Sequence, residues 1–383
     1  MIKKLNSIIR GHLKLIQFGG LKVIGEAFVF LFPILIAKFV APEIYGSYSL
    51  GMMIIFFATT LLLGSSMTPF IISSNKELKS DGGINKSISN QLIFFVISLL
   101  LIGILFLVFG SFIIDFIEID YILLAFLYIA FIGISLKSLL GNYFLGVDKK
   151  IEHTKIGIYY GLLLIVFLFI LGFELKDLFL NYFLSSVIVF IISLRKINFK
   201  EVFPLKFDKE MFLEHWDFTK WQMFGLTAVY FINWGDSIII KIFLTIRDVG
   251  VYNLAYQIFK GIISLLYIIN TFYLPEISKN VKDKKFLSKY LYKSRFEVFG
   301  VVSFGVLIGV FVSPYILNNF FDESYSEASL ILQILLFGVI FKFWSIFYNP
   351  LYNVMKRYKY LQMMNIVQII INVILGVILI LMF

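Results

Sequence analysis

The stretch LIFFVISLLLIGILFLVFG at residues 92–110 contains no charged residue and no proline. A helix rises 1.5 Å per residue, so about 20 apolar residues span the roughly 30 Å hydrocarbon layer of a bilayer. Runs of this kind recur along the whole chain. We therefore predict membrane-spanning helices at residues 17–40, 47–72, 88–112, 121–145, 156–173, 178–194, 223–245, 250–273, 296–317, 330–352 and 362–382.

The composition supports the same class. Of 383 residues, 60% are hydrophobic, 18% are aromatic and only 15% are charged. A water-soluble fold could not hide so much apolar surface, because charged residues make up about a quarter of an ordinary globular domain. The sequence thus predicts an all-α fold, a polytopic membrane helical bundle. Cysteine is absent, which excludes disulfides, thiol catalysis and cysteine metal sites.

The net charge of +10 is an orientation signal, since lysine and arginine gather in cytoplasmic loops. Basic residues fill the start of the chain and every second loop, whereas the loops between them are acidic or nearly neutral. The acidic loops hold Asp115, Glu118 and Asp120, and Asp322, Glu323 and Glu327. We predict a cytoplasmic N-terminus, contact of the basic loops with anionic membrane lipids, and no nucleic-acid partner.

A weak internal repeat also runs through the chain. GSYSL at 46–50 matches GVYNL at 250–254, an offset of 204. LGVDKK at 145–150 and NVMKRY at 353–358 share a similar offset of 208. Because about six predicted helices fall within this offset, the halves would be parallel repeats around a central cavity.

We predict an N-terminal lobe at 1–200, with helices one to six, and a C-terminal lobe at 201–383, with about five. A twelfth helix would begin near residue 384, so the last helix is expected to be missing. Pro33 and Pro69 lie inside predicted helices and predict bends, although neighbouring helices in a bundle can also accommodate proline without function.

Four stretches give the chain a resemblance to a known family. They are APEIYGSYSL at 41–50, WGDSIIIKIFL at 234–244, DVGVYNLAYQI at 248–258 and FFDESYSEASLILQIL at 320–335. In order and spacing they resemble the Wzx-type polysaccharide and oligosaccharide flippases of the multidrug, oligosaccharidyl-lipid and polysaccharide exporter superfamily.

The resemblance implies a substrate and a location. The substrate would be a polyprenyl-pyrophosphate-linked oligosaccharide, moved by alternating access from the inner to the outer leaflet for O-antigen or capsule synthesis. The location would be the bacterial cytoplasmic (inner) membrane, with a glycan polymerase or glycosyltransferases as possible partners. A peptidoglycan-precursor flippase and a multidrug exporter of the same superfamily remain alternatives.

Ionisable residues inside predicted spans are expensive to insert, and they mark candidate sites. Lys22 and Glu26 are spaced i,i+4 in the first helix, where Glu26 could carry a coupling proton and Lys22 could instead snorkel to the surface. Asp236 is a second ion-coupling candidate, and we expect it to pair with Lys260. Lys137 and Lys342 could extend a basic cavity lining.

A polar stripe in the eighth predicted helix is the strongest pattern. Its spacings of three and four residues place the side chains on one helical face, namely Asn253, Gln257, Lys260, Ser264, Tyr267 and Thr271. The stripe predicts either a cavity lining that receives the substrate head group or a hydrogen-bonded helix contact.

The sequence gives little indication of an enzyme. His12, His153 and His215 are scattered without metal-ligand spacing, and neither a nucleotide-binding loop nor a serine-nucleophile motif occurs. No metal site and no cofactor are expected. A membrane glycan polymerase is the remaining enzyme alternative, but its large external loop has no counterpart among the short predicted external loops.

Overall fold

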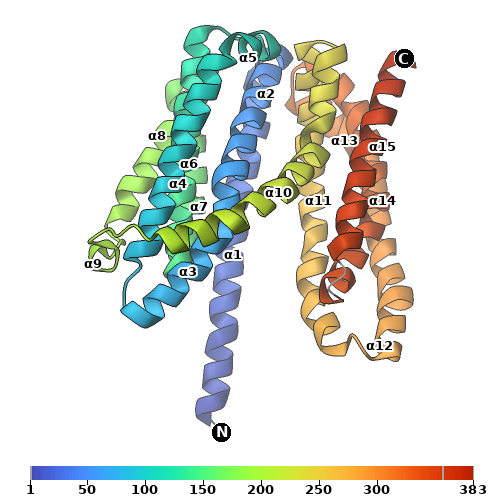
Figure 1. Ribbon diagram of the computed structural model, residues 1–383. Helices are drawn as coiled ribbons and strands as arrows, with labels where there is room; N and C mark the ends of the chain where they lie inside the picture. Colours follow the sequence, from blue (N-terminus) through green and yellow to red (C-terminus); the bar gives the residue numbers. More distant parts are fainter. Residues whose placement is uncertain (1, 356–357, 383) are drawn as a thin grey trace. The chain divides into compact units, whose positions relative to one another are not determined.

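The computed structural model describes residues 2–355 and 358–382, and this part of the chain contains helices and no strand (Figure 1). The predicted all-α fold is confirmed. The helices are α1 (Ile2–Phe39), α2 (Pro42–Thr59), α3 (Ser65–Asp81), α4 (Asn85–Val108), α5 (Gly110–Ile117), α6 (Tyr121–Gly146), α7 (Lys150–Leu171), α8 (Leu175–Leu194), α9 (Phe199–Val202), α10 (Lys209–Phe243), α11 (Ile246–Asn280), α12 (Lys284–Ser288), α13 (Arg295–Phe320), α14 (Glu327–Val354) and α15 (Tyr358–Met382).

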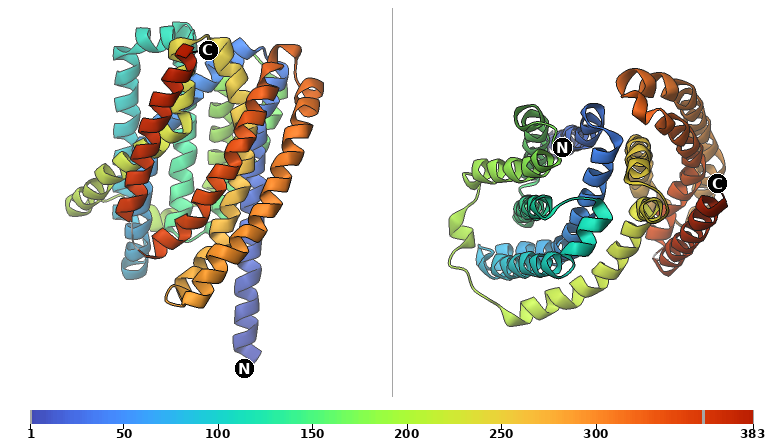
Figure 2. Two further views of the ribbon diagram at one scale, coloured as in Figure 1. Left: turned by 90° about the vertical axis from the view of Figure 1, so that its right-hand side faces the viewer. Right: turned by 90° about the horizontal axis from the view of Figure 1, so that it is seen from above.

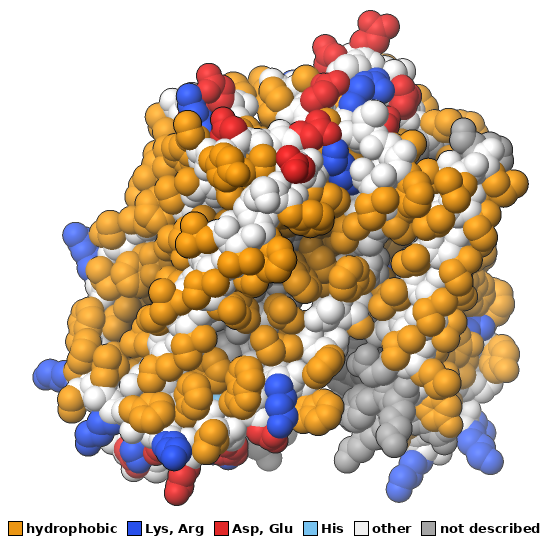
Figure 3. Space-filling model, turned by 45° about the horizontal axis from the view of Figure 1, so that its top comes forward, with side chains coloured by type: hydrophobic (Ala, Val, Ile, Leu, Met, Phe, Trp, Pro, Cys, Tyr) orange, Lys and Arg blue, Asp and Glu red, His pale blue; other side chains and the backbone are white. Residues whose placement is uncertain are grey.

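Ten segments of the described chain are long and apolar enough to cross a membrane. The eighth predicted span, 250–273, lies in α11, where the side chains of 265 and 267–276 are outside the described residues. Many large apolar side chains face outward, including Leu107 at 86% exposure and Phe311 at 79%. Apolar side chains cover most of the face in Figure 3. Such a surface suits lipid tails and not water.

The chain forms two compact units. The first comprises Met1–Ile36 and Leu50–Tyr230, and the second comprises Ala37–Ser49 and Phe231–Phe383. Three helices therefore change unit along their length without a break, namely α1, α2 and α10.

In the first unit, α6 packs closely on α8, and fully buried aromatic side chains fill the interior around them. A Cβ added at Gly133 of α6 would lie 2.6 Å from the Cα of Phe183 in α8. Only a glycine at this position lets the backbones of α6 and α8 come so close. Small residues commonly allow such close contacts between membrane helices.

In the second unit, α14 packs against α11, α13 and α15, which lie together in Figure 2. The segment Ala37–Ser49 joins this unit through Tyr325, whose hydroxyl donates to the Val40 carbonyl at 3.1 Å. The Tyr45 ring lies 6.4 Å from the Tyr325 ring, and both side chains are almost fully buried.

An irregular stretch of helix precedes Pro69, where the sequence predicts a bend. Residues Thr60–Gly64 form a π-helical turn that joins α2 to α3, and Pro69 follows within the next turns. Proline lacks a backbone N–H and its ring conflicts with the carbonyl four residues earlier. Ser65 and Ser66 direct their hydroxyls to the carbonyls of Leu61 and Leu63, which compensates backbone groups of the widened turn.

The two glycines of the sequence repeat face each other across the contact between α2 and α11. A Cβ on Gly46 would overlap the carbonyl oxygen of Ile246, the first residue of α11. In the same way, a Cβ on Gly250 would overlap the carbonyl oxygen of Pro42, the first residue of α2. The contact is thus reciprocal: the fifth residue of each helix touches the first residue of the other.

Alanine at Gly250 should destabilise the protein, because the added methyl group has no space beside Pro42. We expect a loss of about 1–3 kcal/mol, the usual cost of an overpacked contact. Gly235→Ala in α10 is the matched control, since nothing lies within 4 Å of a Cβ at that position. Thermal unfolding in detergent should show a lower midpoint for Gly250→Ala and an unchanged or higher one for Gly235→Ala. Equal midpoints would contradict the contact.

Candidate functional site

A first group of polar residues gathers in the first unit and is called here the α1–α6–α7 cluster. Its members are Lys22, Glu26, Lys137, His153 and Tyr160. The Lys137 ammonium lies 4.1 Å from the centroid of the Tyr160 ring. Glu26 acts electrostatically on Lys137, but the two form no ion pair within 4 Å in the described chain. The structure therefore brings together three predicted site residues, Lys22, Glu26 and Lys137.

Glycines allow this cluster to form. A Cβ on Gly25 of α1 would lie 3.0 Å from the backbone of Gly157 in α7, and a Cβ on Gly161 would lie 3.2 Å from the Val29 nitrogen. Gly157 and Gly161 lie four residues apart on one face of α7, and they let α1 and α7 approach closely. This contact places the Lys22 and Glu26 turn of α1 beside the His153 turn of α7, whose imidazole Nδ1 lies 3.1 Å from the Gly141 carbonyl.

In the second unit, α10 and α11 are held together by a tight turn. Thr245 caps α11, and the Asp248 carboxylate accepts the Thr245 backbone N–H at 2.9 Å in a reciprocal capping box. Only Leu244 and Thr245 separate the helices, so α10 and α11 run antiparallel beside each other. This arrangement defines a second group, the α10–α11 cluster, with Trp234, Asp236, Tyr252, Asn253, Tyr256 and Lys260.

The expected Asp236–Lys260 pair is wrong. The Tyr252 hydroxyl donates to the Asp236 carboxylate at 2.8 Å, and no ion pair of the described residues joins Asp236 to Lys260. The reason is register, because antiparallel packing places Asp236 opposite Tyr252. Ser237, one residue further, donates to the Asn253 side-chain oxygen at 3.0 Å, and the Asn253 amide nitrogen is buried without a partner.

Lys260 lies two turns beyond Tyr252 on α11. Its ammonium is 4.5 Å from the centroid of the Trp234 ring and 5.7 Å from that of Tyr256. An aromatic face attracts a cation by about 0.5–2 kcal/mol. Both Lys137 and Lys260 thus lie against aromatic rings, and neither forms an ion pair with a carboxylate in the described chain.

The other predicted site residues are more scattered. Gln257 is half-buried on α11, and Ser264 is exposed and donates to the Gly261 carbonyl at 2.6 Å. Lys342 is half-buried on α14, a helix that belongs to neither of the two clusters. The side chains of Tyr267 and Thr271 lie outside the described residues.

Sequence reasoning missed the aromatic partners Tyr160, Trp234, Tyr252 and Tyr256. Aromatic residues are common throughout this chain, so a single tyrosine or tryptophan is indistinguishable from lipid-facing or core positions. The signal that could have found them is spacing, because Tyr252 and Tyr256 precede Lys260 by eight and four residues on one helical face.

Comparison with known proteins places this chain in a family. The family model described as "Polysaccharide biosynthesis protein" matches residues 17–281, well over half of the chain. The chain belongs to the polysaccharide biosynthesis protein family. The predicted resemblance is thereby confirmed at the level of the family.

Solved structures show the fold of this polysaccharide biosynthesis protein. One is described as the "Inward-facing conformation of a multidrug resistance MATE family transporter of the MOP superfamily", with a TM-score of 0.70 and 14% identity over 92% of this chain and 87% of that one. A second, "Crystal structure of MATE in complex with MaD3S", has a TM-score of 0.54 and 13% identity over 88% of this chain and 81% of that one. No curated protein sequence matches significantly. The polysaccharide biosynthesis protein therefore shares its fold with these MATE transporters.

The Tyr252–Asp236 hydrogen bond should contribute measurably to stability. Tyr252→Phe removes the donor and leaves a half-buried carboxylate without it, which costs about 1–3 kcal/mol. In a double-mutant cycle with Asp236→Asn, we expect the two effects to be non-additive, since both residues share one interaction. Thermal unfolding of the four proteins in detergent measures the coupling. Additive shifts would mean that the bond contributes nothing.

Proposed function

We propose that this polysaccharide biosynthesis protein is a flippase that carries a polyprenyl-pyrophosphate-linked oligosaccharide from the cytoplasmic to the outer leaflet. The observation that carries the proposal is the pair of lysines, Lys137 and Lys260, held inside their helix packing by aromatic rings and not by carboxylates. Family membership and the transporter fold support transport as the class of function.

The physical reason is charge compensation. A lysine buried beside a carboxylate is already neutralised, whereas a lysine seated on a ring keeps most of its charge for an incoming anion. A diphosphate head group carries negative charge that would otherwise cross hydrocarbon at great cost. Lysines in both units would lower this cost while the polyprenyl tail stays in the bilayer.

Glu26 and Asp236 are the candidates for ion coupling. Glu26 acts on Lys137, and Asp236 accepts from Tyr252, so each carboxylate belongs to a cluster that also contains a lysine. We propose that protonation of Glu26 strengthens the hold of Lys137 on the anion, because the carboxylate no longer competes for the same cation.

The same head-group chemistry occurs in the peptidoglycan precursor, which is the nearest alternative substrate. Cationic drugs, the cargo of a multidrug exporter, are disfavoured because lysines in both clusters would repel them. We further propose the bacterial cytoplasmic membrane as the location, with a cytoplasmic N-terminus, and a glycan polymerase or glycosyltransferases as partners. No chemical step by this chain is proposed.

Removing either lysine charge should slow lipid translocation. Lys137→Met and Lys260→Met keep an unbranched chain of similar length but lose the ammonium, and we expect the rate to fall about ten-fold or more, the equivalent of about 1.4 kcal/mol. The assay follows a labelled polyprenyl diphosphate disaccharide in proteoliposomes, measured as the label that becomes accessible to a membrane-impermeant reagent.

Lys176→Met provides the matched control, because the Lys176 ammonium is exposed and already paired with Glu174 at 2.7 Å. We expect the wild-type rate from this variant. Parallel assays with a peptidoglycan precursor and with a cationic dye distinguish the alternatives. Faster transport of the dye than of either lipid would contradict the proposed substrate class.

A further inference from the structure

A groove of 530 Å³ lies in the first unit, between α3 and the beginning of α10. It belongs to neither lysine cluster. Residues on one face of α3, including Ile72, Ser73 and Lys76, oppose residues on one face of α10, including Met211, Glu214 and Phe218. Its volume lies in the range of small-molecule sites, about 300–1,000 Å³.

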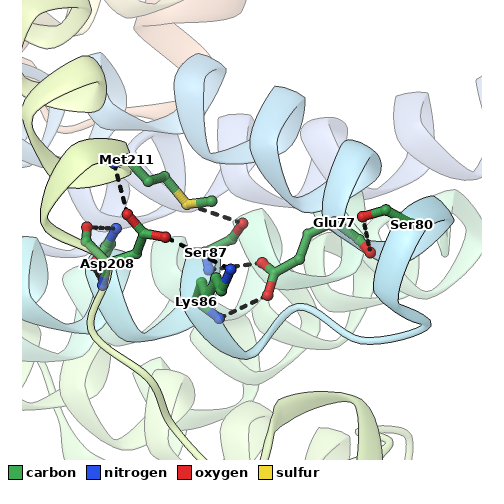
Figure 4. Close-up of polar contacts among 7 residues, drawn as sticks. Glu77, Ser80, Lys86, Ser87, Asp208 and Met211 are labelled. Atoms are coloured by element: carbon green, nitrogen blue, oxygen red, sulfur yellow. Dashed lines mark hydrogen bonds and ion pairs between the residues drawn. The ribbon is translucent and has the colours of Figure 1, made fainter.

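The walls of the groove are fixed by hydrogen bonds (Figure 4). The buried Glu77 carboxylate accepts the backbone N–H groups of Lys86 and Ser87 at 2.8 and 2.9 Å, and so holds the start of α4. Asp208 accepts the Met211 N–H at 3.0 Å and lies 3.7 Å from the Lys86 ammonium. The Asn90 amide donates to the Asp208 carbonyl at 3.0 Å, which fastens the start of α10 to α4.

Glu77, Asp208 and Lys86 are engaged in these bonds. The remaining charged groups of the lining carry a net negative charge. Three further carboxylates line the groove, those of Asp81, Glu210 and Glu214, against one further ammonium, that of Lys76. None of these four side chains has an ion-pair partner among the described residues. In a chain of net charge +10, this groove is an acidic exception on the side predicted to be rich in lysine.

His215 supplies an independent observation. Its side chain lines the groove, is only 3% exposed, and has neither ring nitrogen hydrogen-bonded in the described structure. Buried polar groups normally find partners, and an unpaired one costs about 1–3 kcal/mol. The two ring nitrogens of His215 are therefore polar atoms of the groove that a ligand, or the water it organises, would satisfy.

We propose that this groove binds an organic cation, an ammonium or guanidinium group carried on an aliphatic chain. The carboxylates at its rim would bind the charged group, and the apolar surface of Pro69, Ile72, Met211 and Phe218 would cover the chain. A bare metal ion fits less well, because no group of three or more His, Asp and Glu side chains in the described chain is placed to hold one. Since the ligand is cationic and the proposed cargo is anionic, the groove is not proposed as a site for that cargo.

Two sources carry this chemistry, a free aliphatic amine and a lysine or arginine side chain on a cytoplasmic segment of another protein. Both would bridge α3 and α10, so occupancy should stabilise the folded chain in proportion to ligand concentration. Both should also bind more weakly in high salt, because the rim carboxylates are exposed and readily screened.

The test uses the purified full chain in neutral detergent, with 1,5-diaminopentane and a tetralysine peptide as separate probes in calorimetric titrations. Glu210→Gln with Glu214→Gln removes two rim charges at exposed positions, and we expect at least a ten-fold weaker binding of the probe, a factor of about ten per 1.4 kcal/mol. Asp217→Asn is the control, because Asp217 pairs with Lys220 outside the groove. It should bind like the wild type.

Each outcome decides the proposal. Binding of the diamine that is lost in the double variant supports a free amine, and binding of the peptide alone with the same loss supports a basic segment of a partner. No binding of either probe, or equal binding by the wild type and the double variant, overturns the groove as a cation site. Translocation of the lipid substrate is measured separately, so failure here leaves the proposed transport unaffected.

Discussion

The second unit depends on one close approach, that of α2 and α11 at Gly46 and Gly250. Each helix begins against the fifth residue of the other, and a single methyl group on either glycine would overlap a carbonyl oxygen. The contact holds Ala37–Ser49 within the second unit, together with the hydrogen bond from Tyr325 to Val40. It also fixes the start of α11, and through the following turns the positions of Tyr252, Tyr256 and Lys260 on that helix.

Hydropathy was sufficient to find the long apolar helices, because the lipid requirement for about 20 apolar residues is strict. It underestimated helix length. The predicted span at 223–245 belongs to a helix that begins at Lys209, and the one at 17–40 belongs to a helix that begins at Ile2. Charged and amphipathic residues continue these helices past the apolar segment. Residues 209–220, for example, form the first part of α10.

The candidate site was only partly predictable. Helical periodicity correctly grouped Asn253, Gln257 and Lys260 on one face, since this depends on local geometry alone. It could not give the register between α10 and α11, and the supposed partner of Asp236 was wrong for that reason. The repeat GSYSL and GVYNL suggested equivalent positions in two halves. That the two glycines touch each other is a tertiary contact, on which sequence spacing carries no information.

The unit boundaries fall inside helices, which limits where the protein can be divided into fragments. Since α1, α2 and α10 each pass from one unit into the other without a loop, there is no linker at which the gene could be divided into two self-sufficient parts. A fragment ending near residue 200 would include residues 37–49 without the helices that pack around them. The repeated motifs GSYSL and GVYNL therefore do not mark two separable halves, because three helices are shared between the units.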